Sequence, residues 1–237
     1  MRYFGGKQRI SKQLARYLNT QLTDNQPFVD LFCGSCNIVT KIDDNRLRIA
    51  NDRQKYLIAM WEELQQGWIP PQTVTKQEYK QIRENKDELP HLTGFVGFGC
   101  SFAGKWFEGY ATSDNRNYCK NAYNSTMKKL EHLHNVKFYN MNYNEVTIPK
   151  GSLVYCDIPY KNTTPYRKKE VGVFDHEEFY QWVRDNSDTY EIYVSEYKKN
   201  VPDDFEIVWE IESKKDIRNV ENKRVETVEV LMQYKKI

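Results

Sequence analysis

The chain has 237 residues, which is enough for one substantial core and a modest insertion. Aromatic side chains make up 14% of it, so the composition excludes a disordered chain and suits stacking on nucleobases as well as core packing. The formal net charge of +2 excludes a polycationic protein that coats nucleic acid, although segregated charges on a neutral molecule can still form a basic face.

Apolar, β-branched runs alternate with helical spacing of apolar residues along most of the chain. In chain order, strands are predicted over residues 27–33, 47–50, 152–156, 190–195, 205–209 and 225–234. Helices are predicted around residues 10–18, 56–64 and 179–183, the last one after the N-cap candidate Asp175. This alternation predicts an α/β fold with a largely parallel sheet, and the closely spaced last three strands predict an antiparallel edge.

The alternation fails between residues 66 and 130. Pro70-Pro71 marks the break, a polar helix is predicted over residues 76–86, and a glycine- and aromatic-rich stretch follows over 94–110. We interpret residues 66–130 as a largely helical insertion into a core that residues 1–65 and 131–237 form.

No stretch approaches the roughly 20 apolar residues of a membrane span, and the N-terminus lacks the apolar region of a signal peptide. The five cysteines are irregularly spaced, which is typical of reduced thiols in the cytoplasm. Cys33 and Cys36 have the spacing of a redox or zinc motif, but no second closely spaced Cys/His pair follows. These features predict a cytoplasmic protein without a membrane segment or a bound metal.

Two predicted strands end in residues suited to one cofactor. The first runs into Phe32-Cys33-Gly34-Ser35, where small residues allow close approach of the backbone to a ligand, and Asp52 follows the second. Nucleotide-binding sheets place a carboxylate for ribose hydroxyls at about this spacing. Because the fuller Gly-x-Gly-x-x-Gly pattern is absent, a cofactor with ribose but no phosphate fits better than a dinucleotide. A turn with a structural aspartate is the alternative interpretation.

The segment Tyr3-Phe4-Gly5-Gly6-Lys7 precedes the first predicted helix. Its backbone amides could therefore point at a ligand carboxylate. The alternative is a glycine hinge that only leads into the helix.

The tetrapeptide Asp157-Ile158-Pro159-Tyr160 follows a predicted buried strand and suits chemistry on an exocyclic aromatic amine. Such an amine is a poor nucleophile, and two acceptors that hold its hydrogens stabilise the charge that develops on nitrogen. Asp157 can supply a carboxylate and Ile158 its carbonyl, while Pro159 keeps the preceding residue extended. Tyr160 offers a ring face for stacking a base that has left the duplex. A simple turn is the alternative interpretation.

The order of these segments resembles the Dam-type DNA adenine methyltransferases, with the small phage and prophage members the most similar. The segments that carry the resemblance are Tyr3-Phe4-Gly5-Gly6-Lys7, Asp30-Leu31-Phe32-Cys33-Gly34-Ser35, Asn51-Asp52, the stretch 97–107, Tyr155-Cys156-Asp157-Ile158-Pro159-Tyr160 and Val194-Ser195-Glu196-Tyr197. Their joint order extends over nearly the whole chain and is far more specific than any one motif.

The resemblance implies a Rossmann-like sheet that binds S-adenosylmethionine, formed by residues 1–65 and 131–237, with residues 66–130 as the target-recognition insertion. It implies methyl transfer to the exocyclic amine of adenine in double-stranded DNA after base flipping, in the cytoplasm of a bacterium or a phage-infected host. A cognate restriction enzyme is left open, and so is the oligomeric state, a monomer or a weak dimer.

The resemblance also implies roles for single residues. Asp30 would hold the methionine amino group, Asp52 the ribose, and Asp157 both the cofactor edge and the target amine. The implied catalytic residues are Asp157, Ile158, Pro159 and Tyr160. The implied cofactor-binding residues are Tyr3, Gly5, Gly6, Lys7, Asp30, Phe32, Gly34, Ser35, Asp52, Asn142, Tyr143 and Asp157. The implied DNA-binding residues are Lys105, Trp106, Arg116, Lys120, Lys161 and Arg167, several of them in basic clusters that would hold phosphates.

Three positions depart from the family pattern. The family commonly has Pro at position 158 and Gly at position 36, where this chain has Ile158 and Cys36. Ile158 needs only its carbonyl, whereas Cys36 adds a side chain beside the cofactor loop. Asn142 stands where relatives often have an aspartate near the cofactor adenine.

Two alternatives remain open. A non-catalytic relative that kept the fold would bind duplex DNA without cofactor affinity. A second alternative is methylation of the cytosine amine or of RNA, although the aspartate at position 157 favours adenine, because cytosine-amine enzymes more often have serine there.

Overall fold

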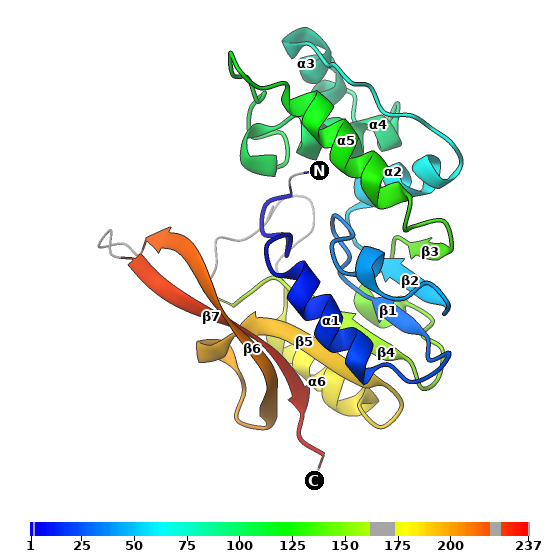
Figure 1. Ribbon diagram of the computed structural model, residues 1–237, viewed down its shortest axis with the longest axis vertical. Helices are drawn as coiled ribbons and strands as arrows, with labels where there is room; N and C mark the ends of the chain where they lie inside the picture. Colours follow the sequence, from blue (N-terminus) through cyan, green and yellow to red (C-terminus); the bar gives the residue numbers. More distant parts are fainter. Residues whose placement is uncertain (2, 162–173, 219–223, 237) are drawn as a thin grey trace.

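The computed structural model describes residues 1, 3–161, 174–218 and 224–236, with the backbone alone for 213–218 and 224–227. Within this part of the chain, seven strands form one sheet in the order β3-β2-β1-β4-β5-β7-β6 (Figure 1). The strands are β1 (Phe28–Asp30), β2 (Arg48–Asn51), β3 (Val136–Tyr139), β4 (Leu153–Cys156), β5 (Glu191–Tyr197), β6 (Phe205–Arg218) and β7 (Arg224–Tyr234).

Parallel pairing joins β3, β2, β1, β4 and β5, whereas β7 runs antiparallel between β5 and β6. The predicted Rossmann-like sheet, mostly parallel with an antiparallel edge, is therefore confirmed. The strand order reverses at β1, because the chain moves outward through β2 and β3 and then returns to the other side of β1 as β4. In open α/β sheets, ligands bind outside the carboxyl ends of the strands at such a reversal.

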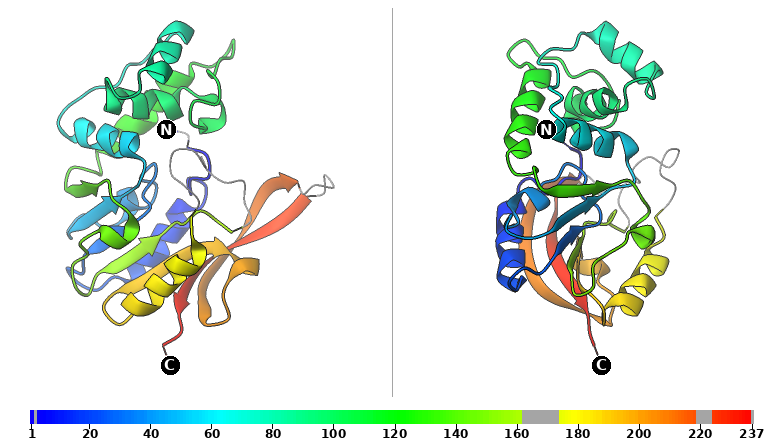
Figure 2. Two further views of the ribbon diagram at one scale, coloured as in Figure 1. Left: turned by 180° about the vertical axis from the view of Figure 1, so that it is seen from behind. Right: turned by 90° about the vertical axis from the view of Figure 1, so that its right-hand side faces the viewer.

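Helices cover both faces of the sheet (Figure 2). They are α1 (Ser11–Gln21), α2 (Lys55–Gln65), α3 (Lys76–Glu84), α4 (Pro90–Gly99), α5 (Tyr118–Leu130) and α6 (His176–Asn186). Because successive strand residues point to opposite faces, Phe28 and Leu153 pack with α1 and α2, and Val29 and Val154 pack with α6. The predicted N-cap of α6 is confirmed, since the Asp175 carboxylate accepts two backbone amides of the first turn.

The helices α3, α4 and α5 gather at one end of the molecule, beside α2 (Figure 1). The predicted polar helix forms as α3 and starts with a capping box between Thr75 and Glu78. On α4, Gly94 allows close packing, since a Cβ there would lie 2.0 Å from the carbonyl oxygen of Tyr56 on α2. We refer to α3, α4, α5 and the loops between them as the helical cluster. Its role as an inserted recognition unit stays a prediction.

Two strands differ from the sequence prediction. The strand β3 was not predicted, because its four residues alternate in burial and the outward Lys137 interrupts the apolar run. The strand β6 is longer than the predicted 205–209, because acids such as Glu210 and Glu212 alternate with apolar residues and continue an edge strand past Trp209.

Short 3-10 helices connect several elements: η1 (Val39–Lys41), η2 (Phe102–Gly104), η3 (Tyr143–Glu145) and η4 (Lys198–Asn200). None of the helices in the described ranges is both long and apolar enough to cross a membrane.

Candidate active site

Three aspartates lie at the carboxyl ends of the neighbouring strands β2, β1 and β4. Asp30 is the last residue of β1, Asp52 follows β2 and Asp157 follows β4. Burial, together with the charges of Asp157 and Asp52, raises the pKa of Asp30 well above its usual range. The sheet therefore brings together the three carboxylates that the sequence prediction singled out.

Asp30 is enclosed by protein, with 1% of its surface exposed. Its carboxylate accepts the backbone amides of Phe32 and Val39. The Oδ1 atom of this side chain has no hydrogen-bond partner among the described residues. A buried carboxylate oxygen without a partner is costly, so this oxygen suits a cationic group of a ligand.

Asp52 fixes the loop that follows β1. Its carboxylate accepts the Gly34 amide at 2.8 Å and the Gln54 amide at 2.8 Å. Gly34 has φ of 47°, and the Tyr3 ring lies over it so closely that a Cβ would stand 3.1 Å from the ring. Asp52 therefore has the structural role that the alternative interpretation gave it, because it stabilises the turn at Gly34. A ligand bound at this loop would contact the same turn.

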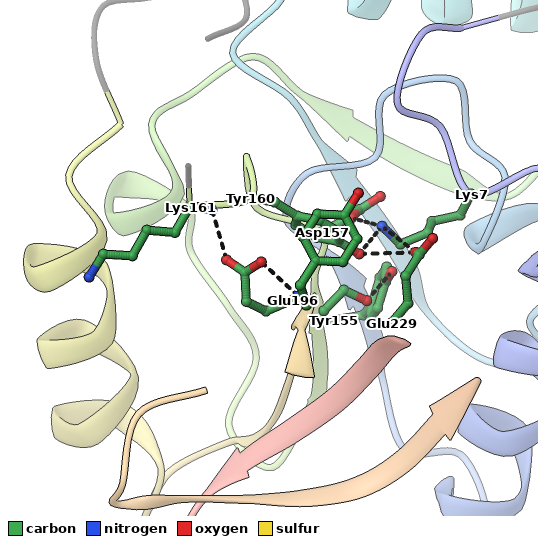
Figure 3. A network of polar contacts seen from close by, with 9 residues as sticks. Lys7, Tyr155, Asp157, Tyr160, Lys161, Glu196 and Glu229 are labelled. Carbon is green, nitrogen blue, oxygen red and sulfur yellow. Dashed lines mark hydrogen bonds and ion pairs between the residues drawn. The ribbon is translucent and has the colours of Figure 1, made fainter. Parts of the chain in front are cut away.

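Lys7 extends from the N-terminal segment into the site and is almost fully buried (Figure 3). Its ammonium lies 2.5 Å from the Asp157 carboxylate and 3.5 Å from that of Glu229, and it also contacts the Tyr160 hydroxyl. The Gly6 amide donates to the Tyr3 carbonyl, so that this amide closes a turn within the segment.

The tetrapeptide after β4 is held on several sides. The Ile158 side chain is buried in the core, and the Pro159 carbonyl lies 2.7 Å from Nε2 of His176 at the start of α6. The Tyr160 hydroxyl donates to Glu229 at 3.2 Å, and its ring lies edge-on to Tyr197, with centroids 4.5 Å apart. The Lys7 ammonium stands 4.2 Å from the Tyr160 ring centroid, so one ring face carries a cation in this structure.

Phe32 and Tyr143 stack with their ring centroids 5.9 Å apart. Burial, with the nearby charge of Glu178, raises the pKa of Tyr143 to about 12. Asn142 is the N-cap of η3, and its backbone amide donates to the Glu145 carboxylate. Ser35 is buried and its hydroxyl accepts from the Asn37 side chain. The cofactor roles of these residues stay predictions.

The expected DNA-binding residues are spread over two regions. Arg116 and Lys120 are exposed in the helical cluster, whereas the Trp106 ring stacks on Tyr56 at 5.3 Å and would meet a Cβ of Gly97 at 2.3 Å. Trp106 therefore packs within the helical cluster. The remaining expected residues are Lys105, which stands 5.0 Å from the Phe4 ring, Lys161, which pairs with Glu177, and Arg167, which lies outside the described residues.

Two buried glutamates in the site were not predicted. Glu229 on β7 is 2% exposed, and Glu196 on β5 accepts the Lys161 amide at 3.0 Å and the Tyr197 amide at 2.7 Å. Burial raises the pKa of Glu196. The signal in the sequence for Glu229 is an acid within an apolar strand, Val228-Glu229-Val230, which an outward-facing residue would also give. Glu196 lies in the segment 194–197 that carries the family resemblance, which gave it no role in the site.

Cys36, one of the departures from the family pattern, has φ of 55° and is fully buried. This left-handed conformation favours glycine, which is the residue the family commonly has there. Among the described residues, no three His, Cys, Asp or Glu side chains are grouped so that they could hold a metal ion.

Comparison with known proteins adds a family. Residues 3–96 match the family described as D12 class N6 adenine-specific DNA methyltransferase. No curated protein matches the chain. A solved structure of SMU.472, provisionally assigned as a methyltransferase and complexed with SAH, is 11% identical with a TM-score of 0.35 and covers 98% of this chain and 54% of its own. The chain thus spans about half the length of that protein. The segment that brings Lys7, Asp30 and Asp52 to the site thus matches the D12 class of N6 adenine-specific DNA methyltransferases, in agreement with the resemblance in the sequence.

Proposed function

We propose that the chain transfers a methyl group from S-adenosylmethionine to the exocyclic amine of an adenine in double-stranded DNA. The observation that carries this proposal is the meeting of Asp30, Asp52 and Asp157 at the reversal point of the sheet, in a chain whose N-terminal segment matches an adenine methyltransferase family.

The donor set fits the cofactor. The unpartnered Oδ1 of Asp30 is suited to the amino group of the methionine moiety, because a bound ammonium would satisfy the oxygen and favour its ionised form. The Gly34–Asp52 pair lies where ribose hydroxyls would bind. When bound, S-adenosylmethionine supplies a methyl group on a positively charged sulfur.

Asp157 is the acceptor for the target amine. Its carboxylate would take hydrogen bonds from the amine, stabilise the positive charge on nitrogen as the N–C bond forms and the bond from the methyl group to sulfur breaks, and receive the proton that the methylated amine loses. The Lys7 ammonium at 2.5 Å from Oδ1 supplies a countercharge and fixes the carboxylate. The contact between His176 and the Pro159 carbonyl anchors the tetrapeptide, whose Ile158 carbonyl is the second acceptor in this proposal.

The DNA would contact the exposed cations of the helical cluster and of the loop after β4. Arg116 and Lys120 are exposed and suited to phosphates, and the proposal adds Lys105 from the helical cluster and Lys161 from the loop after β4. The target base must leave the duplex to reach Asp157, which costs a few kcal/mol. Residues 66–130 are the proposed region for reading the sequence of the DNA. Trp106 supports this region from within.

The test is transfer of a labelled methyl group to duplex DNA, followed by identification of the methylated base. We expect Asp157→Asn to lower kcat by roughly a hundredfold or more, because a neutral amide neither balances the charge nor takes the proton. The matched control is Asp43→Asn, which makes the same chemical change at an exposed position. Unchanged kcat in Asp157→Asn would contradict the catalytic assignment.

The same experiment separates the alternatives. Duplex binding without cofactor affinity or transfer would indicate a non-catalytic relative. Label on cytosine, or on RNA in place of duplex DNA, would contradict the assigned substrate while leaving the amine chemistry intact.

A further inference from the structure

The strand β7 carries a buried carboxylate against the tetrapeptide. Glu229 stands between Val228 and Val230 in an apolar run, and its side chain is 3% exposed. An ionised carboxylate buried in such a place is unfavourable unless it is paired and hydrogen-bonded. Its partners therefore show what the carboxylate stabilises.

Those partners belong to the proposed active site. Glu229 accepts the Tyr160 hydroxyl at 3.2 Å and lies 3.5 Å from the Lys7 ammonium, which in turn lies 2.5 Å from Asp157 (Figure 3). One ammonium is thus shared by two carboxylates, and Glu229 is the one that comes from outside the tetrapeptide.

The register of the sheet makes this contact specific. Glu229 on β7 stands opposite Tyr197 on β5, and the Tyr197 ring meets the Tyr160 ring edge-on at 4.5 Å. This cross-strand pair therefore restricts Tyr160 twice. Tyr197 packs against the Tyr160 ring, and Glu229 accepts the hydrogen bond of the Tyr160 hydroxyl. A one-residue slip of β7 would turn the carboxylate to the other face of the sheet.

The hydrogen bonds in this group have a direction. Lys7 donates to the Tyr160 hydroxyl oxygen, and the hydroxyl donates to Glu229. Burial, followed by the charges of Asp157 and Glu229, raises the pKa of Tyr160 well above its usual range, so the phenol keeps its proton. The hydroxyl proton is directed at Glu229. It therefore does not occupy the Asp157 oxygens, which in the proposed function accept hydrogen bonds from the target amine.

We propose that Glu229 is a positioning residue for methyl transfer, which fixes Lys7 and Tyr160 relative to Asp157 without touching the reacting groups. The inference rests on the proposed function. It also gives the antiparallel edge of the sheet a part in catalysis, because β7 comes from the opposite end of the chain from Lys7.

Two substitutions separate the charge from the hydrogen bond. Glu229→Gln keeps an acceptor for Tyr160 but removes the charge that faces Lys7, and Glu229→Leu removes both. We expect kcat to fall in both variants, by about 10- to 100-fold in Glu229→Leu, because small misplacements of reacting groups cost this much. The affinity for S-adenosylmethionine, measured by calorimetry, and KM for DNA should stay within about threefold, since only the transition state loses an interaction.

The control is Glu206→Gln on the neighbouring strand β6, where the side chain is exposed; we expect kcat within about twofold of the wild type. If Glu229→Leu does not fold, as a thermal melt would show, Tyr160→Phe carries the test. Adding Glu229→Gln to Tyr160→Phe should then cost less than adding it to the wild type.

Wild-type kcat in the Glu229 variants would overturn the inference. A fall in kcat accompanied by an equal loss of affinity for S-adenosylmethionine would overturn it too. So would a double variant in which the effects of Glu229→Gln and Tyr160→Phe on kcat are strictly additive in free energy. A wild-type chain that binds the cofactor and DNA but transfers no methyl group would instead contradict the proposed function.

Discussion

Cys36 combines a left-handed backbone, with φ of 55°, and a fully buried side chain. A side chain in this conformation costs roughly 1–2 kcal/mol, which glycine avoids. The cost is offset in part by the packing of the sulfur, so Cys36→Gly alone mixes two effects of opposite sign.

A pair of variants isolates the backbone effect. Cys36→Ala loses the sulfur but keeps the strained Cβ, whereas Cys36→Gly loses both. We expect Cys36→Gly to be more stable than Cys36→Ala by about 1 kcal/mol in the free energy of unfolding, measured by urea denaturation. A more stable alanine variant would show that the loop does not keep φ positive at this position.

At the scale of single residues, the sequence could assign a residue to the candidate site only where its position in the chain is compatible with one placement in the fold. Asp52 and Asp157 follow apolar runs, so that a parallel sheet must bring them to one end of its strands, whereas Asp30 stands within a run and was singled out by the family resemblance. Glu229 stands inside such a run, where strand alternation allows an inward or an outward side chain. Only the pairing of β7 with β5 decides between the two, and that pairing joins distant parts of the chain.

At the scale of elements, α5 is tied to the loop after β1 by one lysine. The Lys129 ammonium donates to the Ser35 carbonyl and, at 2.8 Å, to the Asn37 side chain. Burial, together with the charge of Lys41, lowers the pKa of Lys129 to about 8. The helical cluster therefore holds the proposed cofactor loop through a cation that titrates unusually early.

This lysine predicts a pH dependence of stability. An unfolded lysine keeps its proton up to about pH 10.5, whereas the folded one releases it near pH 8, so the unfolded state binds more protons between these values. Raising the pH through this window should stabilise the wild type relative to Lys129→Met, by on the order of 1–3 kcal/mol. Urea unfolding of both proteins at pH 7.5 and pH 10 measures the change, and a wild type that gains no stability relative to Lys129→Met between these pH values would contradict the assignment.

Helices and strands were predictable from the sequence where buried apolar residues recur with the spacing of one type of secondary structure. The helices α1, α2 and α6 and the central strands show such periods, and the structure confirms them. The strand β3 could not be predicted, because an edge strand exposes alternate residues and its pairing partner β2 lies far away in sequence. The end of β6 was predicted too early for a similar reason, since an exposed edge strand tolerates charged residues of the kind that also occur in loops.

At the scale of the whole molecule, the N-terminal segment joins the helical cluster to the tetrapeptide. The Phe4 amide donates to the Gly104 carbonyl at 3.1 Å, the Tyr3 ring meets Phe98 at 4.9 Å, and Lys7 pairs with Asp157. A movement of the helical cluster would therefore reach the Asp157 ion pair through five residues of chain. This arrangement favours a coupling between the proposed DNA binding and the geometry of the proposed catalytic carboxylate.

The distribution of charge over the whole molecule gives the last prediction. The net charge is only +2, so the proposed DNA binding must depend on where the cations lie. Lys120 is exposed at the start of α5, and the same helix reaches the loop at the carboxyl end of β1 through Lys129. Lys150 is also exposed but precedes β4, and so lies toward the amino ends of the parallel strands.

We expect Lys120→Ala to weaken binding to any duplex and to reduce the slope of log K against log salt by about 0.9, the loss of one phosphate contact. Lys150→Ala should leave both the affinity and the slope unchanged. Fluorescence anisotropy with a labelled duplex between low and moderate salt measures both quantities. Equal slopes for the two variants would show that the DNA does not lie across the helical cluster, because a duplex bound there should contact Lys120 and not Lys150.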